Sequence, residues 1–168
     1  GMGAFFHRVK RIEVDNKKGG KGEVLVGTAI EGEVTHPRTG HKIAPWLPGR
    51  GEVTVPKGTD RRKIFADWLT HRDNPWFGRT AVNRIWAHLM GRGIVQPVDD
   101  FRDSNPPVNG PLLDALTRDF AAHGFDRIHL IRVILNSRTY QASSRTQRSN
   151  VGDLILFSHF QPRLLTAE

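Results

Sequence analysis

The segment Ala81–Phe101, AVNRIWAHLMGRGIVQPVDDF, decides how the helical part of this chain is interpreted. Its first ten residues place apolar side chains at helical spacing, which predicts one buried stripe on an α-helix. Gly91 and Gly93 then end the helix, because glycine tolerates the positive φ of a helix C-terminus. The segment closes on Asp99 and Asp100 within a proline-bearing loop. It therefore predicts a helix that ends against a long loop, with polar residues at the junction.

The same reasoning predicts a helix before this one and fixes where this one begins. The earlier helix spans residues 59–70, where Thr59 or Asp60 supplies the N-cap. Asn74 followed by Pro75 predicts the cap and the first residue of the helix that runs to the glycines. The inward side chains of both helices repeat at three- and four-residue spacing: Ile64, Phe65, Trp68, Leu69, Phe77, Ala81, Ile85 and Leu89.

Two more helices are predicted after the proline-rich loop. Pro111 opens one that closes at Gly124, and Asp126 caps another over residues 127–140. Only HGFD separates them, and so short a connection favours antiparallel packing of neighbours. We expect the tail at 154–165 to dock back on this core. The predicted inward side chains of the two helices are Leu112, Leu113, Leu116, Phe120, Ile128, Ile131, Ile134 and Leu135.

The first part of the chain has a different pattern, with Gly and Pro throughout. Short β-like runs lie at residues 11–14, 23–27, 32–36 and 51–55. Pro37–Gly40 predicts a hairpin turn flanked by His36 and His41. The glycines and lysines of residues 15–23 predict a turn or loop between the first two runs.

Together these patterns predict a mainly α fold: four to five helices in a compact, bundle-like domain with a small N-terminal β-hairpin or β-rich arm. We expect residues 1–58 to form that arm, packed on the core and not independent. Residues 59–168 then form the helical domain, which we expect to be a piece of a larger protein.

Composition removes several functional classes. The chain has no cysteine, which excludes disulfides, thiolate zinc sites, C-x-x-C-H haem attachment and cysteine nucleophiles. No apolar run approaches the length of about 18 residues that a membrane span needs. Lys and Arg number 25 against 17 Asp and Glu, a formal net charge of +8 that favours acidic partners. The charges are spread along the chain, so a basic surface without a dedicated ligand is the competing interpretation.

The familiar motifs of metal and phosphate sites are missing. There is no H-E-x-x-H and no pair of histidines four residues apart, so no metal site is predicted. The run DDFRDSN at residues 99–105 lacks the order that wraps calcium. The glycine- and lysine-rich run at 17–23 precedes a strand and lacks the phosphate-loop pattern. No G-x-S-x-G elbow indicates a serine hydrolase.

Two interpretations of the opening segment stay open. In the first, Asn83 and Arg84 are a structural clasp that ties their helix to loop carbonyls, and Arg132 finds a carboxylate acceptor such as Asp99, Asp100 or Asp114. In the second, the same groups line a groove that binds a polyol or an anion. Asp99 or Asp100 would then be a candidate catalytic base.

The residues also resemble a known family. The stretches VNRIWAHLMGRGIVQPVDDF and LIRVILNSRTYQASS resemble domain-of-unknown-function family fifteen fifty-three, and the resemblance runs from about Gly32 to the end. Asn109 departs from the family pattern, which usually has histidine there. The resemblance carries no catalytic roles. Its motif positions include Asn83, Arg84, Trp86, Asp99, Asp100, Arg132, Ser137 and Tyr140.

The resemblance implies a context. In that family the domain follows a planctomycete cytochrome-c-type region in large multidomain proteins. It therefore implies an extracytoplasmic location in the periplasm or cell envelope. Haem is expected only in a separate domain of the parent protein, with no cofactor in this chain.

Three functions are compatible with these observations. The first is an accessory or interaction module whose partners are other domains of the parent protein or an anionic polysaccharide. The second is a polysaccharide-acting enzyme domain that uses Asp99 and Asp100, with Asn83, Arg84, Arg132 and Tyr140 as candidate binding residues. The third, nucleic-acid binding, ranks last because the basic residues are not interleaved with aromatic ones.

Overall fold

The computed structural model describes residues 1–14 and 23–163, which form two compact units, Gly1–Thr70 and His71–Glu168. We describe each unit by itself. The units divide after Thr70, whereas the sequence pattern placed a boundary after residue 58. The first long helix groups with the strands because Trp68 near its end packs with Phe5 and Leu47 in a small hydrophobic cluster.

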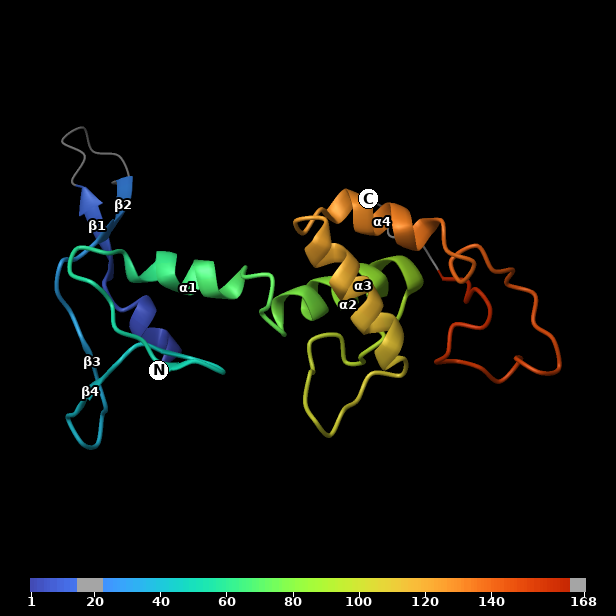
Figure 1. Cartoon of the computed structure of the whole chain (residues 1–168), viewed down its shortest axis with the longest axis horizontal. Helices are drawn as coiled ribbons and strands as arrows, with labels where there is room; N and C mark the ends of the chain where they lie inside the picture. The colour runs from blue at the N-terminus through green and yellow to red at the C-terminus, as the bar shows by residue number, and fades with distance from the viewer. Residues whose placement is uncertain (15–22, 164–168) are drawn as a thin grey trace. The chain divides into compact units, whose positions relative to one another are not determined.

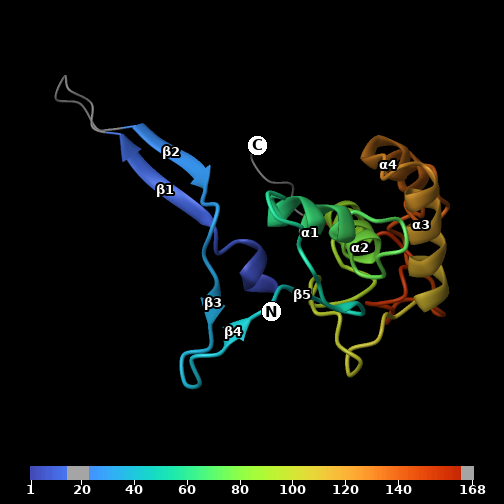
Figure 2. The same ribbon diagram turned by 60° about the vertical axis from the view of Figure 1, so that its left-hand side comes forward.

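The N-terminal unit contains three antiparallel strand pairs. The longest joins β1 (Val9–Val14) to β2 (Glu23–Thr28), as Figures 1 and 2 show. The other pairs have strands of two residues each: β3 (Val34–Thr35) with β4 (Lys42–Ile43), and β5 (Trp46–Leu47) with β6 (Gly51–Glu52). Small N-terminal hairpins are thus confirmed. Residues 15–22 of the loop predicted at 15–23 lie outside the described residues.

The predicted hairpin turn at residues 37–40 is confirmed and uses a histidine. Val34 pairs with Ile43 across it, and Gly40 has a φ of 67°, which favours glycine. His36 Nδ1 accepts hydrogen bonds from the backbone N–H groups of Arg38 and Thr39, both at 3.3 Å. His36 therefore stabilises the turn.

The first helix, α1 (Arg61–Leu69), begins where the sequence predicts. Asp60 is its N-cap and accepts a hydrogen bond from Arg62 N at 2.9 Å. A short 3-10 helix, η1 (Met2–Phe5), precedes the strands, and its Phe5 lies 5.5 Å from Phe65 of α1, centroid to centroid. These aromatic contacts give the N-terminal unit its own small core.

The C-terminal unit is built from α2 (Phe77–Met90), α3 (Gly110–Ala122) and α4 (Arg127–Leu135). The expected helix start at Pro75 is wrong by two residues. Asn74 Oδ1 accepts from Trp76 N and Phe77 N, both at 3.0 Å, so it caps a turn that leads into the helix. The predicted end at Gly91 is confirmed, with a φ of 82°.

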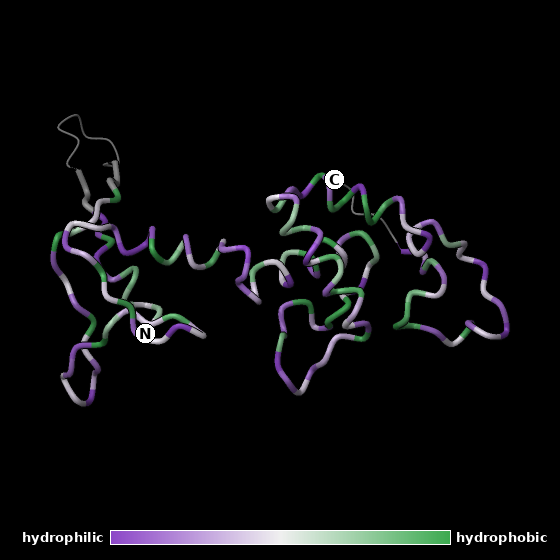
Figure 3. The backbone as a smooth tube through the Cα atoms, viewed as in Figure 1, coloured by the Kyte–Doolittle hydropathy of each residue, from purple (hydrophilic) through white to green (hydrophobic). Residues whose placement is uncertain are grey.

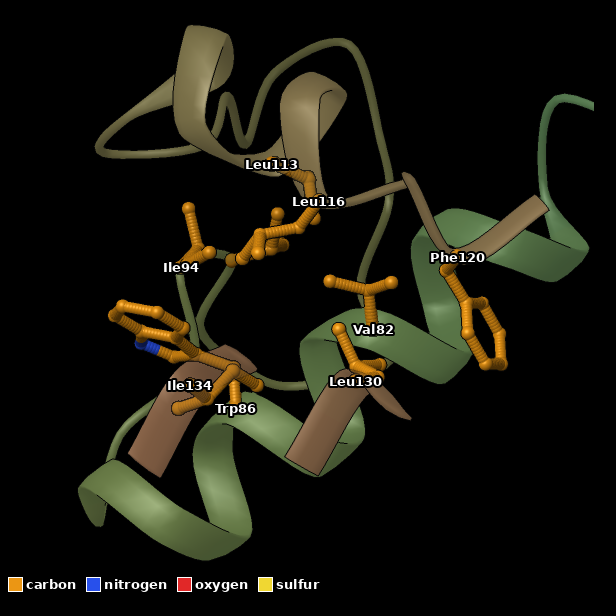
Figure 4. Close-up of a cluster of buried hydrophobic side chains, with 9 residues drawn as sticks. Val82, Trp86, Ile94, Leu113, Leu116, Phe120, Leu130 and Ile134 are labelled. Atoms are coloured by element: carbon orange, nitrogen blue, oxygen red, sulfur yellow. The ribbon is translucent and has the colours of Figure 1, made fainter. Parts of the chain in front are cut away.

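The core of this unit is a cluster of buried hydrophobic side chains from α2, α3, α4 and the loop residues Ile94 and Val95. Figure 4 shows this cluster. Phe157 from the C-terminal tail packs against this cluster and lies 5.3 Å from Trp86, so the expected docking of the tail is confirmed at that residue. The buried members are Val82, Trp86, Ile94, Val95, Leu113, Leu116, Phe120, Leu130 and Ile134.

The fourth helix differs from its prediction in length and in the face it buries. It ends at Leu135, because Asn136 caps it and donates from Nδ2 to the Arg132 carbonyl. Leu130 and Ile134 are its buried residues, whereas Ile128 is 62% exposed. Hydrophobic and hydrophilic residues alternate along this helix in Figure 3.

The fold is mainly helical with small N-terminal hairpins, as predicted. The C-terminal unit packs three helices around one core, and a bundle of four to five helices is not shown, because α1 belongs to the other unit. Within the described residues, no helix is both long and apolar enough to cross a membrane.

Candidate functional site

Asn83 is the polar centre of the junction between α2 and the loop that follows it. Its side chain is fully buried. Asn83 Nδ2 donates to Val95 O at 2.9 Å and to Val98 O at 2.8 Å, while Oδ1 accepts from Val95 N at 3.0 Å. A buried loop backbone needs such partners, since it has no strand or helix to supply them. The single amide of Asn83 therefore binds the loop backbone at both Val95 and Val98.

Gly93 completes the junction by leaving room for it. A Cβ at this position would lie 2.2 Å from Val95 O and within 3.1 Å of both polar atoms of the Asn83 amide. Ile94 and Val95, which follow directly, are buried in the core. Position 93 therefore has room only for glycine. The sequence indicated Gly93 only as a residue that ends the helix, and the structure shows that it also makes room for the Asn83 amide.

Arg84 and Asp99 form a bidentate pair beside the buried amide. Arg84 Nε and Nη2 donate to the two carboxylate oxygens of Asp99, both at 2.7 Å. This hydrogen bonding lowers the pKa of Asp99 and raises that of Arg84. Both side chains are more than half exposed. Asp99 is therefore an ionised, already engaged carboxylate, which makes it a weak general base at neutral pH.

Asp100 has a different arginine. Arg102 Nε lies 2.6 Å from Asp100 Oδ1, and its Nη2 donates to Oδ2 at 2.7 Å. The backbone carbonyl of Asp100 accepts from Asn105 Nδ2 at 2.8 Å. The two adjacent aspartates thus each bind a separate guanidinium, and these contacts order the loop.

Arg132 and Tyr140 lie apart from this junction. Arg132 is exposed on α4, and the carboxylates expected to accept from it bind other arginines, with Asp114 lying 3.3 Å from Arg79. Within the described residues Arg132 pairs with none of these three carboxylates, so the acceptor expected for it is wrong. Tyr140 is half-buried after α4, and its backbone N–H donates to Ser137 Oγ at 3.1 Å. Within the described residues, no hydrogen bond or salt bridge joins either residue to Asn83, Arg84 or the two aspartates.

A second feature is a segment, beginning at α4, that contains several arginines and no acidic residue. Between Asp126 and Asp153 the chain contains no Asp or Glu. The arginines of this run are all exposed, and none forms a salt bridge within the described part of the chain. We call residues 127–148 the basic segment. Counting acids between successive arginines would have revealed it from the sequence. Its arginines are Arg127, Arg132, Arg138, Arg145 and Arg148.

The turn between α3 and α4 gathers a third group that motif reasoning missed. Asp119 and His123 are four residues apart at the end of α3, and His129 lies in the first turn of α4. His129 Nε2 is 2.8 Å from Asp119 Oδ2, and the two imidazole rings are stacked with centroids 3.7 Å apart. The histidines are six residues apart across a turn, so no helical spacing rule could pair them.

The N-terminal unit contains a cavity of about 190 Å³ with arginines in its wall. Its two arginines, Arg8 and Arg61, both donate to Glu33 Oε1, at 2.7 Å and 2.6 Å. Hydrogen bonds from Arg61 and then Arg8 lower the pKa of Glu33. The Glu33 carboxylate therefore bridges the two arginines of the cavity wall.

Comparison with known proteins supplies the family. A search of curated proteins and a search of solved structures each found no match. A family model described as "PSD1: Protein of unknown function (DUF1553)" matches residues 61–168. The match contains α1 to α4, the basic segment, and the junction residues Asn83, Arg84, Asp99 and Asp100. The chain therefore belongs to the PSD1 family of proteins of unknown function, DUF1553, as its motifs indicated.

Proposed function

We propose that this domain is a non-catalytic accessory module that binds an anionic partner through the basic segment. The observation that carries this proposal is the set of five exposed arginines without an intervening acid or a salt-bridge partner in the described chain. Unpaired guanidinium groups on a surface attract carboxylate, sulfate or phosphate and bind them bidentately. An acidic polysaccharide or an acidic neighbouring domain offers such groups.

The geometry of the loop junction supports a non-catalytic role. Asp99 and Asp100 were the candidate acid and base, and each carboxylate binds an arginine with both of its oxygens. Asn83 is buried and bonded to backbone. An enzyme that used these residues would first have to break the contacts that order its own loop.

The composition of the basic segment favours a glycan or a protein over nucleic acid. Single-stranded nucleic acid is usually bound by stacking its bases on aromatic side chains. Tyr140 is the one aromatic residue between Arg127 and Arg148, and it is half-buried. Charge contacts without stacking therefore suit a carboxylated glycan or an acidic protein surface.

The proposed setting comes from the family resemblance. We propose a larger cell-envelope protein in which haem belongs to a separate cytochrome-type domain. The absence of cysteine agrees with a domain that attaches no c-type haem itself. Fractionation of cells that express the full-length parent protein tests this placement, and a cytoplasmic parent would contradict it.

Binding to a defined acidic glycan tests the module. Polygalacturonate is titrated into the 168-residue chain at low and physiological salt. Replacement of three arginines of the basic segment (R138E/R145E/R148E) should weaken binding by about tenfold or more. A matched control (K42E/K57E/K63E) makes the same change in net charge in the other unit and should retain most of the affinity.

The outcomes separate the alternatives. Strong salt dependence with loss only in the arginine variant supports the proposal. Equal loss in both triple variants would show attraction to net charge alone and would overturn it. Tighter binding of a single-stranded oligonucleotide than of polygalacturonate would favour nucleic acid instead, and release of reducing ends would favour the enzyme.

A further inference from the structure

The turn between α3 and α4 brings three metal-ligating side chains to one point on the surface. Asp119 and His123 project from successive turns at the end of α3, and His129 projects from the start of α4. One ligand atom from each residue lies within 4.8 Å of the other two. We infer that Asp119, His123 and His129 form a binding site for a zinc-class divalent cation.

The donor set indicates the class of ion. Two imidazole nitrogens and one carboxylate oxygen suit borderline ions such as Zn²⁺, which binds these atoms at about 2.0–2.2 Å. Ca²⁺ and Mg²⁺ prefer six or more oxygen ligands, which this group does not offer. Three protein ligands leave a fourth tetrahedral position for water, and the half-exposed His123 side chain places the group at the solvent boundary. The site would thus be of the open kind.

The backbone that carries the three ligands is firmly held. Gly124 and Phe125 both have positive φ, at 63° and 61°, so the turn has a defined and tight shape. The Phe125 ring packs edge-on against Phe120 and Phe77, with centroids 5.4 Å and 5.2 Å away. Asp126 accepts from the backbone N–H of His129 at 3.2 Å. The ligands therefore project from a preorganised corner, which lowers the entropy cost of binding.

Only side-chain adjustment separates the present arrangement from coordination. Asp119 Oδ2 now lies 2.8 Å from His129 Nε2, and the imidazole rings are nearly parallel, with an interplanar angle of 19°. Lone pairs in parallel ring planes cannot meet at one ion, so one ring must turn. His123 is the more exposed of the two histidines and can rotate about its Cβ–Cγ bond. An ion would then replace the Asp119–His129 hydrogen bond, and rotation of His123 would break the contacts of its Nδ1 with Asp119, at 2.9 Å to the carbonyl and 3.3 Å to Oδ1.

The net charge of the protein makes this inference specific. At +8 the chain repels cations on average, so non-specific accumulation of Zn²⁺ on its surface is disfavoured. Measurable binding must come from direct coordination. If Zn²⁺ binds here, its affinity should depend on Asp119 of α3, on His123 at the end of α3 and on His129 of α4. Substitution of each side chain therefore tests the site.

The experiment is calorimetric titration of Zn²⁺ into the metal-free 168-residue chain. We expect one ion per chain, with affinity reduced by at least about 10–100-fold in His123→Ala and in His129→Ala. His88→Ala removes an exposed histidine from α2 and should bind as the parent does. Asp119→Asn keeps the shape of the side chain and should weaken binding without unfolding the domain. Circular dichroism checks that each variant is folded.

Two further readouts decide the inference. Zn²⁺ should raise the melting temperature of the parent chain but not that of His129→Ala, since only an ion bound to the folded state stabilises it. Ca²⁺ and Mg²⁺ should give no comparable heat. Equal affinity in the parent, His123→Ala and His129→Ala, or loss of binding in His88→Ala alone, would overturn the site.

Discussion

Asn83 shows how one side chain can determine the course of a loop. An amide offers both donors and an acceptor, and here the loop supplies two carbonyls and one N–H within reach. Aspartate would lack the donors, and leucine would leave all three backbone groups, two of them buried, without this partner. Asparagine suits this position because it supplies the donors and the acceptor that these loop backbone groups bind.

Replacing Asn83 with alanine should destabilise the C-terminal unit. The substitution leaves the two buried backbone groups of Val95 and the partly buried Val98 carbonyl without this partner, and an unsatisfied buried group costs roughly 1–3 kcal/mol. We expect the free energy of unfolding, measured by urea denaturation, to fall by about 2–4 kcal/mol. Arg84→Gln removes only an exposed ion pair and should change it far less. Equal effects of the two substitutions would contradict this ranking.

Asp153 should make the C-terminal tail sensitive to acid. A hydrogen bond from the Ser158 side chain, then backbone N–H groups of Leu156, Ile155 and Ser158, hold its pKa well below the usual range. Because the folded pKa is depressed, the added stability is present above the unfolded pKa of about 3.9 and is lost as the pH falls below it.

Amide exchange measures that loss. The N–H groups of Leu156 and Ser158 should lose protection progressively below about pH 4, after correction for the intrinsic rate. Asp153→Asn should reduce protection already at neutral pH and flatten the acid response. Asp103→Asn, at an exposed loop aspartate, is the control and should behave as the parent. Unchanged protection in Asp153→Asn would refute the role of this carboxylate.

Helix caps and helical spacing predicted most of the helix boundaries. Asp60, Asp126 and Gly91 end or begin helices where expected. The errors occur where tertiary contacts decide. Ile128 fits an apolar stripe, but it lies in the first turn of α4 and is exposed, while Leu130 and Ile134 one turn apart reach the core.

Asn109 is the N-cap of α3. Its Oδ1 accepts a hydrogen bond from Leu112 N at 3.0 Å. Asn109→Ala should lower the free energy of unfolding by about 1 kcal/mol, because the cap is lost. Asn109→Ser retains a capping oxygen and should stay close to the parent. Chemical denaturation compares the two, and a fully neutral alanine variant would contradict the cap.

The two units have separate cores, and the core of the N-terminal unit includes residues of α1. A fragment of residues 1–58 lacks Phe65 and Trp68, which complete the cluster around Phe5 and Leu47. It should show no cooperative thermal transition, because paired short strands alone are only marginally stable. A fragment of residues 1–70 restores α1 and should gain structure by circular dichroism. Cooperative melting of the shorter fragment would contradict this account.

The candidate sites were less predictable than the fold. Asn83 and Arg84 could be singled out, but their partners lie 12 to 15 residues away in a loop without a regular pattern. The sequence predicted that Arg132 would pair with one of the nearby carboxylates. Residue spacing shows which face of a helix a side chain lies on, but not which residues of other elements face it. Asp119, His123 and His129 come together because of the shape of the turn between α3 and α4. Rules of residue spacing do not predict that shape.

In the proposed module Asp99 and Asp100 order a loop and take no part in chemistry. The most direct test is the double substitution D99N/D100N, with polygalacturonate binding, reducing-end release and melting temperature measured on one preparation. We predict that binding is retained or strengthened because two negative charges are lost, that no reducing ends form in either protein, and that the melting temperature falls less than in Asn83→Ala. Loss of binding or turnover at an unchanged melting temperature would show that these carboxylates act on a substrate.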